Sequence, residues 1–599
     1  MNIQKILSSA ASLLLLLPMQ LHAADVYVKS GESLNDALRE ARELRRLEKV
    51  AAGEQVTIHL EAGEYPLYEA LHVRHEDSGT PDAPTIIRSE GGAVVHGGVK
   101  IEGWKKQGRF WVAETPSFNG RPLDFRQLYV NGEKATRARD VEDFEKMHRV
   151  IRNDKVKREL WVPAKAVEKL VEVKGGKTRL KAQFAEMVMH QMWCVANLRI
   201  KSIRVEGDSA AVTFHDPEQR IEFERPWPQP MITDDGRNSA FYLTNAYELL
   251  DTPGEWYHDI IGRKIYYMPK KNETLREVIA PAIETLVHVE GTLDRGVANV
   301  RFENITFAYT TWMRPSLLGH VPLQAGMYMT DGYKLRPQMI RHNNHKLDNQ
   351  GFLGRPSAAV VVEGAGNIDF IGCTFTHLGA SGLDYKWGTQ GGRIDRCTFR
   401  DIAGNGIVTG SFSPASHETH QPYDPADSRE VCSGLQITNN LITNVTNEDW
   451  GCVGICAGYV RDINIEHNEI SEVSYTGISL GWGWTRTVNC MRNNRVHANL
   501  IHHYAKHMYD VAGIYTLGSQ PHSFITDNCV HTIYTPGYAH DPHHWFYLYT
   551  DEGSSFITVK NNWTEGEKFL QNANGPGNVW ENNGPMVADS IKVKAGIVK

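Results

Sequence analysis

Asp510 and Asp551 are the carboxylates whose positions in the sequence could support acid–base chemistry. Asp510 lies in HMYDVAGIYTLG, and Asp551 follows 41 residues later in FYLYTDEGSS. Two carboxylates that flank a glycosidic bond are the usual equipment for its hydrolysis, one as the acid and the other as nucleophile or base. Aspartate is also a common turn residue, and Thr-Asp-Glu-Gly suits a turn. Their residue types therefore leave a catalytic and a structural interpretation open.

Aromatic and polar side chains in the same region are candidates for contacts with a sugar. Flat aromatic rings suit the apolar faces of sugars, and several tryptophans fall in or beside turns, two of them in the Gly-Trp-Gly-Trp stretch at 481–484. Any single tryptophan is equally well explained as a side chain that covers the edge of a coil. The candidate substrate-binding residues are Asp384, Trp387, Trp482, Trp484, His544 and Glu552.

A histidine-rich loop, YAHDPHHW at 538–545, raises the question of a metal site. Three histidines surround Asp541, but their spacing matches no standard zinc pattern, and Pro542 would break any helix that aligned them. Cys452 and Cys456 form a lone CxxxC, which is weak evidence for zinc. We therefore expect no metal and no other cofactor. His544 and its neighbours are expected to bond sugar hydroxyls or to orient a carboxylate.

The second half of the chain repeats with periods of 24 to 34 residues where no insertion intervenes. Each repeat holds short, alternating, β-branched segments between turn residues and no helix-length amphipathic pattern, which disfavours helical solenoids. Stacked repeats of this kind predict an all-β, right-handed parallel β-helix with an inserted β-sandwich-like domain. One register position holds Asn304, Asn440, Asn468, Asn499, Asn528 and Asn562, and another holds Gly382, Gly406, Gly454, Gly477 and Gly513.

The repeat register makes Asp510 unusual. It precedes the register glycine Gly513 by three residues, and a carboxylate at that place is not part of the repeat consensus. Asp551 comes about one coil and one excursion later, so we expect the two carboxylates to face one another on adjacent rungs. Asp384 follows Gly382 by two residues, where the neighbouring repeats have Val408, Cys456, Ser479 and Tyr515.

The sequence divides into four segments. Residues 1–23 resemble a secretory signal peptide with cleavage near Ala23, because a short basic start precedes an apolar stretch and small residues. Residues 24–127 are expected to hold an N-terminal cap, with a helical pattern at 33–50, and the first coils. An inserted β domain is expected at 128–290, and the main β-helix with the catalytic site at 291–599.

Composition narrows the functional class. The 599 residues include 64 basic and 71 acidic side chains, a net charge of -7, which argues against nucleic acid or an anionic membrane surface as a partner. The signal peptide predicts a periplasmic or secreted protein without membrane insertion. Eight cysteines are present. Because Cys373 and Cys397 recur at matching places, buried free thiols are the simpler expectation.

Several motifs extend these inferences to a known family. The segments FRQLYVNGEKATRARD, ELLDTPGEWYHDIIGRKIYYMP, HVPLQAGMYM, AGIYTLG and YTDEGSS occur in this order on a signal-bearing β-helix. Together they resemble glycoside hydrolase family 141 over nearly all of the mature chain. The resemblance implies α-L-fucosidase activity on a complex pectin, or xylanase activity. It also implies that the catalytic pair is Asp510 and Asp551 and that Glu552 does not take the catalytic role.

The sequence therefore predicts an exported, monomeric glycoside hydrolase whose partner is an oligo- or polysaccharide of the plant cell wall. A xylanase or xylosidase is the first alternative. A polysaccharide lyase is another, but it needs a Lys or Arg base beside a calcium-binding carboxylate cluster, and the region offers only Lys506 and Lys560. A non-catalytic glycan-binding β-helix is the third. The sequence does not identify which aspartate is the acid.

Overall fold

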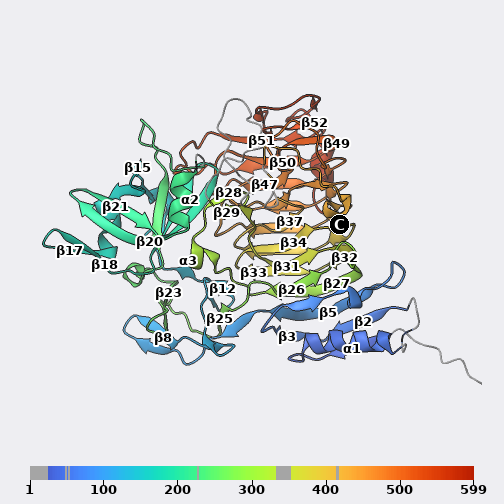
Figure 1. Cartoon of the computed structure of the whole chain (residues 1–599), viewed down its shortest axis with the longest axis horizontal. Helices are drawn as coiled ribbons and strands as arrows, with labels where there is room; N and C mark the ends of the chain where they lie inside the picture. The colour runs from blue at the N-terminus through green and yellow to red at the C-terminus, as the bar shows by residue number, and fades with distance from the viewer. Residues whose placement is uncertain are drawn as a thin grey trace, which may run out of the picture.

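The repeats of the sequence form successive coils of a right-handed parallel β-helix, as predicted (Figure 1). The computed structural model describes residues 24–47, 50, 54–225, 228–331, 353–412, 417 and 419–598. The predicted signal peptide, residues 1–23, lies outside these ranges. Within them, no helix combines the length and the apolarity needed to cross a bilayer.

Three parallel ladders of strands run along the solenoid. The first consists of β1 (Ala24–Val28), β2 (Val56–Leu60), β5 (Thr85–His96), β27 (Val297–Ala308), β32 (Ala365–Ile371), β35 (Arg393–Asp395), β39 (Gln436–Thr438), β43 (Asn464–Glu466), β46 (Arg495–His497), β49 (Ser519–Thr526), β52 (Ser555–Lys560) and β55 (Val579–Glu581). The second consists of β3 (Gly63–Pro66), the later halves of β5 and β27, β33 (Thr374–Leu378), β36 (Thr398–Ile402), β40 (Leu441–Val445), β44 (Glu469–Ser471), β47 (Leu500–Tyr504), β50 (Cys529–Ile533) and β53 (Trp563–Thr564).

The third ladder carries the side chains that matter most for the site. Its strands are β4 (Leu71–Val73), β26 (Val287–Glu290), β31 (Ala358–Glu363), β34 (Ser381–Trp387), β37 (Ile407–Thr409), β41 (Ile455–Ala457), β45 (Ile478–Leu480), β48 (Val511–Thr516), β51 (Trp545–Thr550) and β54 (Phe569–Gln571). The predicted glycine register is confirmed, because Leu383, Ile407, Ile455, Ile478 and Ile514 pair along this ladder, each directly after its register glycine.

The predicted asparagine register is confirmed with one exception. From Asn440 onward each buried side-chain amide donates to the next asparagine at 2.8–3.0 Å, and Asn583 extends the ladder at its C-terminal end. Each amide thereby satisfies polar groups that burial would otherwise leave unpaired. Asn304 was wrongly assigned to this register. Thr306 pairs with Thr374, which places Asn304 opposite Gly372, one position away, where it is exposed.

The N-terminal cap is a helix, as predicted. Helix α1 (Leu34–Arg46) begins after Ser33, whose hydroxyl accepts from the Asp36 amide at 3.2 Å, an N-cap contact. The helix buries a Leu-Ala-Leu-Ala stripe against the first rungs, at the blue end of the solenoid in Figure 1. It covers the open end of the first ladder, whose strand edge would otherwise be free to pair with another chain.

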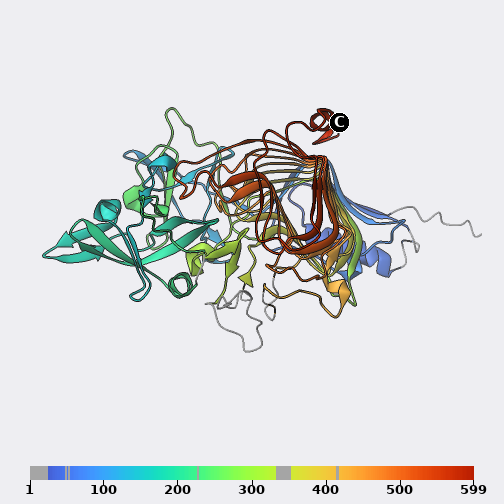
Figure 2. The same ribbon diagram turned by 90° about the horizontal axis from the view of Figure 1, so that it is seen from above.

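The inserted domain lies beside the solenoid on the side of the third ladder (Figures 1 and 2). Its larger sheet consists of β14 (His148–Arg149), β22 (Ala240–Thr244), β19 (Glu186–Gln191), β20 (Cys194–Glu206), β21 (Ser209–Phe214), β16 (Glu159–Pro163) and β15 (Arg152–Asp154). A second sheet consists of β13 (Thr136–Arg137), β23 (Glu255–Asp259), β24 (Lys264–Tyr267), β8 (Phe110–Glu114) and β7 (Lys105–Gln107).

The insertion begins earlier than the predicted residue 128. β5 pairs directly with β27, and β4 pairs directly with β26. The chain between the end of β5 and the start of β26 therefore lies outside the solenoid. At the base of the insertion, β6 (Gly98–Lys100) pairs antiparallel with β25 (Val278–Pro281). β6 follows β5 after a single residue, so no turn signal separates the last coil strand from the first strand of the insertion. The solenoid resumes at Val287, before the predicted residue 290.

A second, shorter excursion leaves the solenoid after β27. It contains α3 (Arg314–Leu318), β28 (Pro322–Gln324), β29 (Met327–Met329) and β30 (Leu353–Gly354). β28 and β29 pair antiparallel, and the backbones of Asn197 and His320 form a bridge that joins this excursion to β20 of the inserted domain. The eight cysteines are free and buried, as predicted.

Candidate active site

Asp551 directly follows β51 and is fixed by its backbone and by its side chain. Its amide donates to the Thr516 carbonyl at 3.0 Å, and its own carbonyl accepts from Ser554 at 3.0 Å. Gly553 has a φ of 78°, and a Cβ atom there would lie 2.5 Å from the Thr485 carbonyl oxygen, so the turn requires glycine. The Thr-Asp-Glu-Gly segment is therefore a true turn that also presents a carboxylate.

The Asp551 carboxylate accepts two hydrogen bonds. Tyr515 Oη donates to Oδ2 at 2.6 Å, and Asn572 Nδ2 donates to Oδ1 at 2.7 Å. Burial nevertheless raises the pKa of Asp551 to about 6. The hydrogen bond from Tyr515 opposes that rise, the negative charge of Asp510 adds to it, and Asn572 opposes it. Asp551 can therefore hold a proton near neutral pH, as a general acid must.

Asp510 directly precedes β48, which is the rung next to β51. Its φ of 54° lies in the left-handed region, where non-glycine residues are uncommon. Its amide donates to the His544 carbonyl at 2.6 Å, and Tyr475 Oη donates to the Asp510 carbonyl at 2.8 Å. His544 Nε2 lies 3.2 Å from Asp510 Oδ1. This contact raises the pKa of His544, which favours a cationic imidazole beside the Asp510 side chain.

Both aspartates border one cavity of about 210 Å³. As predicted, they belong to adjacent rungs, but they flank these rungs from opposite ends. Tyr515 and Tyr549, which pair across the two rungs, line the cavity between them together with Tyr475. Burial raises the pKa of all three tyrosines well above its ordinary value, so their hydroxyls stay protonated as hydrogen-bond donors.

The opposite wall of the cavity comes from outside the solenoid. Trp193 lies in the tight turn between β19 and β20 of the inserted domain, and Gln324 ends β28 of the second excursion. Trp193 Nε1 donates to the Leu323 carbonyl at 2.7 Å, which ties the two segments together. The inserted domain is therefore part of the candidate active site.

A buried arginine holds these two segments in place. Arg225, directly after α2 (Glu218–Glu224), is fully buried and donates through Nη1 to the Pro322 carbonyl at 2.6 Å. Its Nη2 donates to the side chain of Gln191, two residues before Trp193, and lies 2.8 Å from Glu222. One planar guanidinium thus connects the β19–β20 turn to β28.

Three of the predicted substrate-binding residues lie at this site. Trp484 and Glu552 line the cavity, and His544 contacts Asp510. Trp482 was expected there but is 1% exposed and absent from the cavity lining. Its ring packs edge-on against Trp484, with centroids 5.4 Å apart, and against Phe412, so it supports Trp484 from behind.

Asp384 and Trp387 do not reach the cavity. Both belong to β34, which is separated from β48 along the third ladder by β37, β41 and β45. Asp384 is 2% exposed, and Arg355 donates to its carboxylate. The unusual carboxylate in this register is therefore explained by a buried ion pair, which offsets the cost of burying it.

The lysines required by a lyase mechanism lie elsewhere. Lys506 Nζ is 2.9 Å from Glu472, and Lys560 Nζ is 2.7 Å from Glu581, and neither residue lines the cavity. Sequence reasoning missed the three tyrosines, Trp193 and Asn572. Tyr515 and Tyr549 were detectable, because they are aromatic two places after the register glycine position, where the rungs from β34 to β45 have Asp384, Val408, Cys456 and Ser479.

Replacing Tyr515 by phenylalanine should move the pH dependence of the reaction. The lost hydrogen bond stabilises ionised Asp551, so its removal raises the pKa of Asp551, by about one unit for a bond to a charged group. If Asp551 is the acid, the alkaline limb of kcat/KM moves to higher pH. The measurement is a pH–rate profile. Tyr385→Phe is the control, since it removes a buried hydroxyl that bonds the Ile368 carbonyl. An alkaline limb that stays in place or moves to lower pH would contradict the role of the hydrogen bond from Tyr515 to Asp551.

Replacing Trp193 by alanine should raise KM by about tenfold with a smaller effect on kcat. The ring forms one wall of the cavity, and lost contacts that ground state and transition state share appear in KM. Steady-state kinetics on one substrate provide the measurement. Trp545→Ala is the control. Trp545 begins β51 on the third ladder, lies outside the cavity and packs under Lys568. Equal changes in KM for both variants would refute the role of Trp193.

Comparisons with known proteins bear on this geometry. The protein-family model described as the GH141 insertion domain matches residues 108–270 of this chain. A solved structure described as a glycoside hydrolase is 64% identical, covers 96% of this chain and 99% of its own, and superposes with a TM-score of 0.93.

More remote similarities carry no functional argument. PfbA, a surface adhesin of Streptococcus pneumoniae, is 10% identical over 94% of this chain and 83% of its own, with a TM-score of 0.34. The catalytic unit of the GH87 α-1,3-glucanase from Streptomyces thermodiastaticus is 10% identical over 81% and 89%, with a TM-score of 0.22. No curated protein matches significantly.

Proposed function

Because this chain belongs to the glycoside hydrolases of family 141, we propose that it removes a terminal α-L-fucosyl residue from a complex pectin, with Asp551 as general acid. The observation that carries the proposal is a pair of aspartates in unlike environments at one small cavity. Burial favours the protonated form of Asp551, whereas Asp510 faces a histidine whose charged form it stabilises. Two carboxylates with such different surroundings are suited to opposite roles.

In the proposed reaction, Asp551 donates its proton to the glycosidic oxygen as the bond to the anomeric carbon breaks. The Asp510 carboxylate either attacks the anomeric carbon or removes a proton from the attacking water. His544 orients the Asp510 carboxylate, because it contacts both the carboxylate and, through its carbonyl, the Asp510 amide. The hydroxyls of Tyr475 and Tyr515 already donate to Asp510 and Asp551, so toward the sugar they act as hydrogen-bond acceptors.

The size and lining of the cavity support a single deoxy-sugar as the residue cleaved. A volume of about 210 Å³ lies below the roughly 300–1,000 Å³ of ordinary small-molecule sites, which suits one ring better than several. The rings of Trp193, Trp484 and Tyr549 offer apolar surface to the methyl group that distinguishes fucose from a fully hydroxylated hexose.

A xylosidase or xylanase is the alternative, since a pentose ring would also fit. The deciding experiment assays aryl α-L-fucoside, aryl β-xyloside and xylan side by side with the purified enzyme. Release of fucose alone supports the proposal, and activity confined to the xylosides or to xylan replaces it. Unsaturated products that absorb in the ultraviolet would instead establish a lyase.

We also propose that the protein is exported. The short basic start, the apolar stretch that follows it and the small residues Ala23 and Ala24 support this proposal. Mass spectrometry of protein expressed with its complete N-terminus tests this proposal. A mature chain that begins near Ala24 is expected, and a chain that retains residues 1–23 would contradict it.

A further inference from the structure

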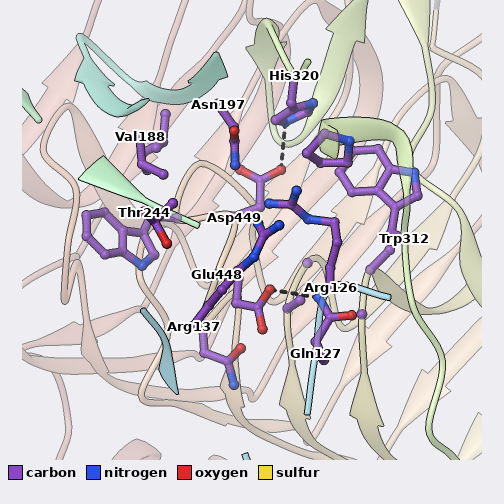
Figure 3. A pocket seen from close by; sticks show the side chains of 18 of the residues that line it. Arg126, Gln127, Arg137, Val188, Asn197, Thr244, Trp312, His320, Glu448 and Asp449 are labelled. Carbon is purple, nitrogen blue, oxygen red and sulfur yellow. Dashed lines mark hydrogen bonds and ion pairs between the residues drawn. The ribbon is translucent and has the colours of Figure 1, made fainter. Parts of the chain in front are cut away.

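A second cavity, of about 270 Å³, lies between the inserted domain and the solenoid (Figure 3). It is separate from the cavity of Asp510 and Asp551, but the same two segments of the chain lie between the two cavities. Asn197 on β20 and His320 before β28 face this second cavity, whereas Trp193 and Gln324 of the same two segments face the active site. Glu448 at its rim has a side chain 37% exposed, so the cavity communicates with solvent.

Polar atoms in its wall lack partners. His320 Nε2 lies 2.9 Å from Asp449 Oδ2, and both side chains are buried, with 4% and 11% exposed. His320 Nδ1, Asp449 Oδ1 and Asn197 Oδ1 are buried without a hydrogen-bond partner among the described residues. These three atoms are closed off from solvent, so they make the wall polar from behind the cavity surface.

The charges around the cavity balance. Arg126 and Arg137 both pair with the buried Glu186, at 2.8 and 3.0 Å. Lys134 lies between Asp401, at 3.1 Å, and Glu448, at 3.2 Å. Arg139 and Asp449 also line the cavity, so four basic and two acidic side chains border it, and Glu186 and Asp401 behind the wall offset the remaining two positive charges. A site without net charge gives no advantage to an anion or a cation, whereas its donors and acceptors suit hydroxyl groups, which can both donate and accept.

Aromatic rings supply the remaining wall. Trp312 lies against His320, with ring centroids 5.0 Å apart, and is labelled beside it in Figure 3. Trp450 stacks on His507 at 4.3 Å on the other side. Indole rings combined with carboxylates, amides and guanidinium groups suit a ring that has apolar faces and a polar rim.

From this geometry we propose that the cavity is a second carbohydrate site, which binds one neutral monosaccharide ring. Its hydroxyls donate to the Asp449 carboxylate and accept from the arginines that line the cavity. The site does not depend on which linkage the enzyme cleaves, because it contains neither Asp510 nor Asp551.

The test is calorimetric titration of the Asp510→Asn protein with L-fucose, D-xylose, D-galactose and D-galacturonate. At least one neutral sugar should bind at two sites. Adding Asp449→Asn should weaken one site by about tenfold or more, the loss expected for a hydrogen bond to a charged group. Adding Trp193→Ala should weaken the other site. Asn197→Ala is a second probe of the cavity if Asp449→Asn lowers the thermal unfolding temperature.

Asp140→Asn is the matched control, because Asp140 forms a similar pair with His148 at 3.0 Å outside the cavity lining. It should leave both binding events intact. One binding event that Trp193→Ala removes and Asp449→Asn leaves unchanged would overturn the proposal. Binding of galacturonate alone at the second site would also overturn it, in favour of an anion site. If the wild-type protein hydrolyses its substrate but only one sugar-binding site is found, this inference alone is refuted. If two sites bind sugar but no hydrolysis occurs, the proposed reaction alone is refuted.

Discussion

Asp551→Asn should lower kcat/KM on a natural glycoside by about 10²–10⁴-fold, the usual contribution of a positioned general acid. The amide keeps the shape of the carboxyl group but cannot give up a proton to the glycosidic oxygen. The loss should therefore depend on the leaving group. A dinitrophenyl glycoside departs without protonation, so it should lose at least tenfold less activity than a phenyl or alkyl glycoside.

Asp395→Asn controls for the change of a hydrogen-bonded carboxylate. The Asp395 carboxylate also accepts from one hydroxyl, that of Thr438 at 2.8 Å, and from one amide, that of Asn439 at 3.3 Å, and it additionally pairs with Arg396 at 2.7 Å. It lies on β35, far along the solenoid from β51. The control should keep the wild-type rate on every leaving group. An equal loss for good and poor leaving groups in Asp551→Asn would show that Asp551 is not the acid.

Asp510→Asn should remove activity on good and poor leaving groups alike. An amide is neither a nucleophile nor a base, so the step at the anomeric carbon fails whatever the leaving group is. The expected loss is about 10³-fold or more, since residues that act as a unit in catalysis have large single effects. The side chain contacts His544, and its neutral replacement also removes the reason for a charged imidazole.

Asp527→Asn provides a close control for this variant. Asp527 also has a left-handed φ, 58° against 54° for Asp510, and it faces His497 at 3.4 Å on another face of the solenoid. Backbone strain and an aspartate–histidine contact are thus present in both, and only Asp510 borders the cavity. Comparable losses of activity in Asp510→Asn and Asp527→Asn would show that the effect arises from folding rather than from catalysis. Circular dichroism shows directly whether either variant is misfolded.

The solenoid was predictable because its physics is local and repeated. A period of short apolar segments, a buried asparagine and a glycine recurs in the sequence, and the structure stacks these residues rung on rung. The error at Asn304 came from reading the residue type without the register. The start of the insertion was missed because β6 follows β5 with one residue between them, so the change from parallel to antiparallel pairing leaves no mark in composition.

The candidate site was predictable only in part. Asp510 departs from the consensus of its repeat, and Asp551 ends an aromatic strand, so both were detectable. Trp193 was not, because it reaches the cavity through contacts between segments distant in sequence, which Arg225 joins. Trp482 was misplaced since the burial of its ring depends on Phe412, in another coil. Asp384 departs from consensus too, but its partner Arg355 lies in an excursion that no periodicity constrains.

The most direct test of the central claim, that Asp551 is the general acid, is the pH dependence of kcat/KM on a phenyl glycoside for the wild type and Asp551→Asn. This parameter reports the free enzyme, in which burial raises the pKa of Asp551 to about 6. As the pH rises through that value Asp551 loses its proton, so wild-type kcat/KM should fall. The residual activity of Asp551→Asn should lack this limb. The same limb in both enzymes would contradict the assignment of Asp551 as the acid.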